Sequence, residues 1–106
     1  EIFQQILTEY CGVLDLALEQ KLFLVDHDLS SRLKKIAGRL GALRASPRDV
    51  VDLHTRAVQE KKNKTNQQKY AGYLEEGRLV LLELMGFLTA YYRYQSLGIE
   101  SSEGEG

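Results

Sequence analysis

Two histidines and a single cysteine are the side chains of this sequence that most readily act as nucleophiles, bases or transition-metal ligands. Cys11 stands among apolar residues and is far in sequence from His27 and His54, whereas a catalytic thiol needs a base beside it. We therefore expect Cys11 to be a small buried hydrophobic residue. A single cysteine also excludes an internal disulfide.

The tripeptide Asp26-His27-Asp28 places three potential metal ligands in a row. Neighbouring side chains of a helix point about 100° apart, so they do not converge on one ion. The glycines are scattered along the chain and form no phosphate-binding loop. We therefore expect neither a metal site nor a cofactor.

Three roles are open to His54. Its neighbours Leu53 and Val58 place it on the inward half of a helix, as a partly buried histidine bonded to a backbone or carboxylate group. It could instead contact a partner protein. With Arg56 nearby it could also accept a phosphoryl group, as in four-helix phosphotransfer domains that present an exposed histidine. No acid, base and nucleophile form a recognisable catalytic group, so we expect the chain not to be an enzyme.

The composition predicts one globular domain, with 43% hydrophobic and 27% charged residues. A net charge of −1 argues against binding to nucleic acid, which usually requires a strong basic excess. The longest apolar run, Leu79 to Leu82, falls well short of the roughly 18–20 residues of a membrane span. The sequence begins with no signal peptide, so we expect a cytoplasmic protein without a membrane segment.

Apolar residues at spacings of three and four predict four helices, over about 2–22, 29–43, 47–61 and 66–96. The expected fold class is therefore all-α, a bundle of four or five helices. The joint between the first two helices is placed near residues 22–27, where Asp26 or Asp28 could cap the second helix.

Two of the helix starts carry cap signals. Ser46 is expected to cap the third helix, with Pro47 at its first position and Asp49 at its third. Thr65, followed three residues later by Gln68, resembles a capping box for the fourth helix.

Gly98 is the expected end of the fourth helix. Residues 99–106 are acidic and rich in glycine and serine, which predicts a disordered linker or an artificial tail. Residues 1–98 then form a helical domain for dimerisation and partner binding.

The fourth helix is apolar over more than half its circumference between Leu79 and Tyr94. Such a helix must be buried on more than one side. We expect a second subunit to cover one side, although the excess apolar surface could also pack within a tight bundle. The predicted homodimer interface consists of Leu81, Leu84, Met85, Phe87, Leu88 and Tyr91.

Tyr91, Tyr92 and Tyr94, with Arg93, either pack in the core and the dimer interface or form a patch that binds a partner protein, because tyrosine and arginine are favoured at binding surfaces. The basic face of the second helix, which includes Arg32, Lys35 and Arg39, is either a solvated face or a surface that steers an acidic partner. The predicted partner-binding residues are Leu53, His54, Arg56, Ala57 and Tyr92.

The stretch from Ser46 to His54, with Ala90-Tyr91 further along the chain, resembles a small superfamily. It unites the N-terminal domain of the stress-response phosphatase RsbU with the C-terminal domain of the circadian protein KaiA. Both start a helix with proline, continue with an acidic, apolar, apolar, variable, aliphatic, histidine pattern, and close a long apolar helix on alanine–tyrosine. The matching residues here are Pro47, Asp49, Val50, Val51, Leu53, His54, Ala90 and Tyr91.

The resemblance implies a helical bundle that dimerises, binds a regulatory protein and performs no chemistry itself. In the phosphatase, such a domain receives a switch kinase and controls a downstream serine phosphatase. In the clock protein, it captures a peptide of a partner ATPase. The acidic tail fits a linker to a following domain, so we favour the phosphatase-like role in bacterial stress signalling. The circadian role is the alternative, and phosphotransfer through His54 is a third interpretation.

Overall fold

The computed structural model describes the backbone of residues 1–104 and the side chains of residues 1–97. Four helices account for nearly all of this part of the chain: α1 (Ile2–Phe23), α2 (Leu29–Ala42), α3 (Pro47–Lys64) and α4 (Gln67–Gly104). The described residues contain no strand. The all-α, four-helix architecture predicted from the sequence is therefore confirmed.

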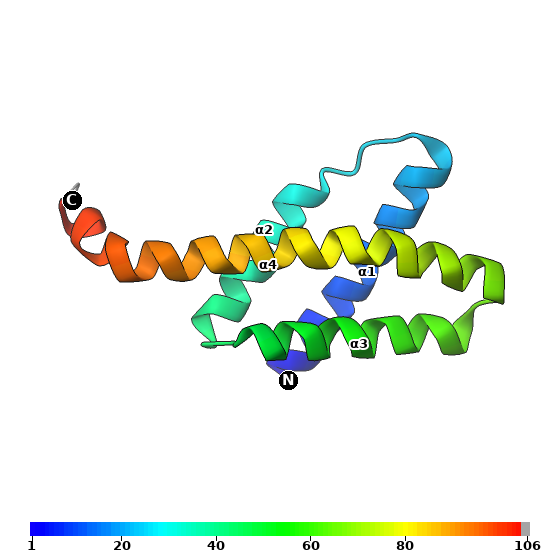
Figure 1. Cartoon of the computed structure of the whole chain (residues 1–106), viewed down its shortest axis with the longest axis horizontal. Helices are drawn as coiled ribbons and strands as arrows, with labels where there is room; N and C mark the ends of the chain where they lie inside the picture. The colour runs from blue at the N-terminus through cyan, green and yellow to red at the C-terminus, as the bar shows by residue number, and fades with distance from the viewer. Residues whose placement is uncertain (105–106) are drawn as a thin grey trace.

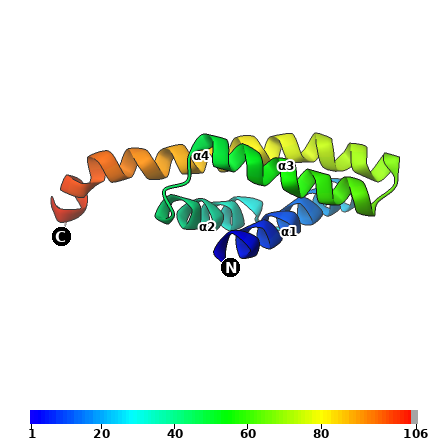
Figure 2. The same cartoon turned by 90° about the horizontal axis from the view of Figure 1, so that it is seen from below.

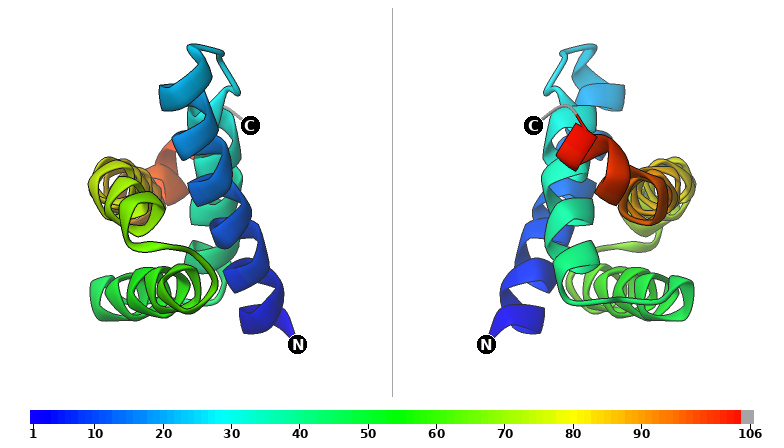
Figure 3. Two further views of the ribbon diagram at one scale, coloured as in Figure 1. Left: turned by 90° about the vertical axis from the view of Figure 1, so that its right-hand side faces the viewer. Right: turned by 90° about the vertical axis from the view of Figure 1, so that its left-hand side faces the viewer.

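The four helices form two layers. α3 and α4 run antiparallel in one layer, and the antiparallel pair α1 and α2 crosses them steeply in the other (Figures 1 and 3). α4 contacts each of the other three helices. Its C-terminal part extends past the ends of α1, α2 and α3 (Figures 1 and 2). The helix thus has one portion inside the bundle and one portion outside it.

The predicted start of α3 is confirmed by its hydrogen bonds. The backbone N–H of Asp49 donates to Ser46 Oγ at 3.1 Å, and the Ser46 N–H donates to Asp49 Oδ2 at 2.8 Å. Pro47 occupies the first helical position, where its missing N–H leaves no bond unmade. This reciprocal cap fixes the point at which the chain enters the second layer.

The predicted cap of α4 is wrong by one residue. The Lys69 N–H donates to Asn66 Oδ1 at 2.8 Å, so Asn66 caps the helix that begins at Gln67. The Thr65 hydroxyl instead donates to the Lys61 carbonyl at 2.6 Å, at the end of α3. Asparagine is the stronger N-cap of the two, which explains the choice.

The joint between α1 and α2 falls at residues 24–28, close to the predicted 22–27. Leu24 and Asp28 both adopt the left-handed backbone conformation, with φ of 56° and 54°. Asp28 occupies the N-cap position of α2, as one of the two predicted candidates, but its side chain makes no capping hydrogen bond.

The end of α4 differs from the prediction. The helix continues to Gly104, so Gly98 does not end it. Residues 105–106 lie outside the described part of the chain. The function of residues 99–106 as a linker stays a prediction.

Candidate protein-interaction site

The residues predicted to form the dimer interface lie on the inner face of α4. Leu84 and Leu88 are 0% and 2% exposed, inside the core of their own chain. A side chain without exposed area cannot contact a second subunit, so their assignment to a dimer interface is wrong. Leu81, Met85 and Phe87 are partly buried and pack against the same core.

Tyr91, the last residue of that predicted interface, also serves the fold. Its ring rests on Gly41 of α2 so closely that an added methyl group there would lie 2.4 Å from it. The ring of Tyr92 meets that of Tyr91 edge-on, and the Tyr92 hydroxyl donates to the Ala45 carbonyl at 2.6 Å. These two half-buried tyrosines hold α4 against α2 and the loop that follows it.

The residues predicted to bind a partner are not brought together on one surface. Leu53 and Ala57 are fully buried, so their assignment to a binding surface is corrected: they belong to the core. Arg56 is exposed, and its guanidinium lies over the Phe3 ring at 5.4 Å from the centroid. Tyr92 lies at the loop between α2 and α3 instead.

His54 is held by α1 and α4. The Tyr10 hydroxyl lies 2.7 Å from His54 Nδ1, and the two rings meet edge-on. On the α4 side, His54 Cε1 would lie 3.1 Å from a methyl group added at Gly77. Burial lowers the pKa of His54 and raises the pKa of Tyr10. Both groups are therefore neutral near pH 7, and they share one hydrogen bond whose direction depends on the tautomer of the imidazole.

This environment favours a structural role for His54. The histidine is partly buried, as one of the sequence interpretations expected, but its partner is a tyrosine hydroxyl rather than a backbone or carboxylate group. A phosphoacceptor needs a ring nitrogen that a donor protein can reach. Here Nδ1 is engaged and the Cε1–Nε2 edge of the ring faces Gly77, so the geometry gives the phosphotransfer interpretation no support.

Polar side chains continue beside His54 along the contact between α1 and α3. Cys11 is buried and donates to Glu60 Oε1 at 3.7 Å, and burial raises the pKa of its thiol. A protonated thiol is a poor nucleophile. The Lys61 ammonium and the Tyr73 hydroxyl both donate to Asp15 Oδ1, at 2.8 and 2.6 Å. These contacts join helices and form no catalytic arrangement.

No metal-binding group emerges from the described residues, where no cluster of three or more histidine, cysteine, aspartate or glutamate side chains could hold an ion. His27 lies in the loop before α2, with its Nε2 at 2.6 Å from Glu19 Oε1.

The outer face of α4 carries the apolar surface that sequence reasoning missed. Leu79, Leu82, Tyr94 and Leu97 are 62%, 69%, 74% and 55% exposed. Gly86 and Ala90 lie between them and are also exposed. We call these six residues the outer stripe of α4. Their spacings of 3, 4, 4, 4 and 3 residues keep them on one side of the helix.

Gly86 is not crowded by any of the described residues. A methyl group added there would meet nothing within 4 Å, in contrast to Gly41, Gly72 and Gly77, which are crowded by other helices. A mid-helix glycine costs about 1 kcal/mol relative to alanine. The cost at Gly86 is therefore not offset by packing within the chain, and the small residue opens space on the outer stripe.

No protein-family model, curated protein or solved structure matches the chain. Within the described residues, no helix is both long and apolar enough to cross a membrane. The function must therefore be inferred from the fold, from the outer stripe and from the sequence pattern in α3 and α4.

Proposed function

We propose that this chain is a non-catalytic signalling module that forms a homodimer through the outer stripe of α4 and binds a regulatory protein with other surfaces. The observation that carries the dimer is the symmetry of the stripe. Its spacings read the same in both directions about position 88. A twofold dimer brings the same patch of both copies together, and antiparallel helices place residues at equal distances from the midpoint at the same level.

Antiparallel pairing gives each residue of the stripe a suitable neighbour. It places Leu79 level with Leu97 of the second copy, Leu82 with Tyr94, and Gly86 with Ala90. The small residues meet at the centre, where they let the two helices approach closely. The charges agree as well: Glu83 and Arg93, each five residues from position 88, come to the same level with opposite sign. A parallel pair would instead place Glu83 level with Glu83 of the second copy and Arg93 level with Arg93, so that like charges would face each other.

The projecting end of α4 supports the same proposal. The C-terminal part of α4 extends past the other helices (Figure 1), and Tyr94 and Leu97 near this end of the helix are exposed. A helix segment shorter than about 12–15 residues is only marginally stable in water without tertiary contacts. A second copy of α4 would supply such contacts.

Partner binding rests on the resemblance to the RsbU and KaiA domains. The matching residues of α3 build the fold here: Asp49 completes the cap and Leu53 lies in the core. We therefore infer the same kind of helical bundle. In the RsbU-like role, which we favour, a switch kinase binds the domain and controls a serine phosphatase in cytoplasmic stress signalling. A clock ATPase would be the partner in the KaiA-like role.

The dimer can be tested by sedimentation velocity on the whole chain and on Leu82→Glu. A carboxylate in an apolar interface is costly to desolvate, so we expect a dimer for the wild type and a monomer for the variant, in which circular dichroism should show that most of the helix content is kept. Val51→Glu is the matched control, because Val51 is an exposed apolar residue on α3 and should leave the dimer intact. A monomeric wild type, or a fully dimeric Leu82→Glu, would refute the interface.

Disulfide trapping in a Cys11→Ala background tests the antiparallel register. Leu79 and Leu97 are 18 residues apart, which is about 27 Å along a helix. A mixture of Leu79→Cys and Leu97→Cys chains should therefore form a mixed disulfide, whereas each chain alone should not cross-link to itself. Efficient self-linking of Leu79→Cys would indicate parallel helices instead.

A further inference from the structure

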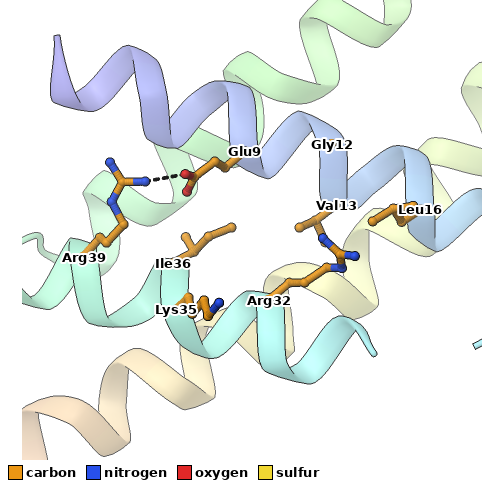
Figure 4. Close-up of a pocket in the computed structure, with 8 residues that line it drawn as sticks. All are labelled: Glu9, Gly12, Val13, Leu16, Arg32, Lys35, Ile36 and Arg39. Carbon is orange, nitrogen blue, oxygen red and sulfur yellow. Dashed lines mark hydrogen bonds and ion pairs between the residues drawn. The ribbon is translucent and has the colours of Figure 1, made fainter. Parts of the chain in front are cut away.

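A groove with a volume of about 580 Å³ runs between α1 and α2, and no contact described so far uses it. Each helix contributes residues at spacings of three and four, so the groove follows both helix axes. Its apolar floor includes Val13 and Leu16 from α1 and Ile36 from α2 (Figure 4). Its rim carries Arg32, Lys35 and Arg39 from α2.

The rim is basic although the whole chain has a net charge of −1. Three cationic side chains face one carboxylate, Glu9, and the Arg39 guanidinium pairs with that carboxylate at 2.5 Å. Arg32 uses only its Nε, which donates to the His27 carbonyl at 3.1 Å. The Lys35 ammonium has no ion pair within the described part of the chain. Most of the N–H groups of Arg32 and Lys35 are therefore available to bind another molecule.

Gly12 forms part of the α1 wall of this groove. A methyl group added at Gly12 would meet nothing within 4 Å, so no packing inside the chain requires glycine there. The glycine weakens α1 by about 1 kcal/mol relative to alanine. It also leaves the groove open to the α1 backbone, with room for an incoming apolar side chain.

We propose that this groove binds an acidic, amphipathic helical segment of the regulatory partner. Apolar side chains of that segment would fill the space over Gly12 and Ile36, and its carboxylates would bind Arg32 and Lys35. The inference deepens the proposed function, since it rests on partner binding by this domain. It does not depend on the outer stripe of α4.

The spacing of the cations favours a helix over a small anion. Arg32, Lys35 and Arg39 follow one another at three and four residues and span about 10 Å along α2. A helical ligand lying along the groove repeats carboxylates over the same distance, whereas one phosphate group spans a small part of it. A second hollow beside His27 and Ser31 is also lined by Arg32 and Lys35, so the basic rim continues beyond the groove.

Selection of peptides on the full chain tests the proposal without knowledge of the partner. A displayed library of helical peptides is panned on the wild type, and enriched peptides are measured by fluorescence anisotropy. We expect enriched peptides to combine glutamate or aspartate with leucine-like residues at helical spacing. Their affinity should fall at least about tenfold for Arg32→Glu with Lys35→Glu, since both partner charges are then repelled.

Two glycine variants give a matched comparison. Gly12→Leu should fill the groove and block the selected peptides, whereas Gly38→Leu should not, because Gly38 is a mid-helix glycine with equal free space that does not line the groove. No enrichment above background, enrichment of basic peptides, or equal binding to both glycine variants would overturn the proposal. Saturation of the groove by inorganic phosphate at the affinity of the best peptide would also overturn it, in favour of a small anion.

The same variants separate this inference from the dimer. The groove variants should stay dimeric in sedimentation, and Leu82→Glu should still bind the selected peptides. A monomeric wild type that still binds the selected peptides would refute the outer-stripe interface alone. A dimeric wild type that enriches no selective peptide would refute the groove alone.

Discussion

Both faces of α4 carry large apolar side chains, but only those of the inner face are buried within the chain. Leu84 and Leu88 on the inner face are buried by the other three helices, whereas Leu79 and Leu82 on the outer face are exposed. The inner face is therefore a folding surface, and the outer face is the exposed surface to which we assign the proposed dimer. The two faces of α4 differ because α1, α2 and α3 pack against the inner face and leave the outer face uncovered.

The glycines of α4 differ in the same way. Gly77 lies on the inner side, next to His54 and Leu14, where a larger residue would crowd both side chains. Gly86 lies on the outer side, where an added methyl group would meet none of the described residues within 4 Å. The inner glycine is explained by packing within the protomer, whereas the outer glycine is not and is a position where the proposed dimer could bring two helices close together.

Truncating a leucine on each face should give the largest contrast. Leu88→Ala should lower the free energy of unfolding by about 2–5 kcal/mol, because it leaves a cavity in the core. Leu82→Ala should change it by no more than about 0.5 kcal/mol in the monomer, where the side chain is already exposed. Urea unfolding measures both values, at a protein concentration low enough for the dimer to dissociate.

Equal losses of stability from the two leucine variants would mean that the outer stripe is also packed within the monomer. In that case the stripe could not be a dimer interface. Leu84→Ala should reproduce the effect of Leu88→Ala, since both side chains are buried in the same core.

Local signals in the sequence were sufficient for the helices and for one of their caps. Ser46, Pro47 and Asp49 lie next to one another in sequence, so their bonding follows from their types alone. The fold class was predictable for the same reason, since apolar spacing reports helices directly. The cap of α4 was missed because Thr65 and Asn66 are adjacent candidates, and the pattern of Thr65 with Gln68 favoured the weaker one.

The binding surfaces required information that lies far apart in the chain. Leu84 and Leu79 both fit a helical apolar pattern, and the choice between them depends on where α1, α2 and α3 pack. The partner of His54 is Tyr10, 44 residues away, which no local pattern indicates. The signal that could have found the outer stripe was its symmetric spacing about position 88, together with the position of Gly86.

Alanine at the two glycines of α4 should separate the faces by a smaller amount. Gly86→Ala should raise the free energy of unfolding of the monomer by about 1 kcal/mol, the gain in helix propensity, because the added methyl meets no atom. Gly77→Ala should gain less or lose stability, since its methyl would lie 3.1 Å from His54 Cε1. Thermal unfolding of dilute samples compares the two.

The same pair of variants should behave oppositely in association. Gly86→Ala should weaken the dimer several-fold in sedimentation, because it separates two helices that meet at small residues. Gly77→Ala should leave the dissociation constant of the dimer unchanged. A dimer strengthened by Gly86→Ala would show that close approach at position 86 is not required.

The smallest effect should be a dependence of stability on pH that comes from the inner side alone. Burial lowers the pKa of His54 below its ordinary 6.5, so the unfolded chain binds more protons than the folded chain between the two values. The contribution of this histidine is fully present above about pH 6.5 and is lost as the pH falls toward its folded pKa. On protonation Nδ1 becomes a donor only, so its hydrogen bond with Tyr10 must then run from the imidazolium to the hydroxyl oxygen. Urea unfolding from about pH 7.5 to about pH 5 should therefore show a steeper loss of stability for the wild type than for His54→Gln, which keeps a polar side chain but cannot titrate.

Equal slopes of stability against pH for the two proteins would mean that His54 has the same pKa in the folded and the unfolded chain. Its contacts with α1 and α4 would then not distinguish its protonation states.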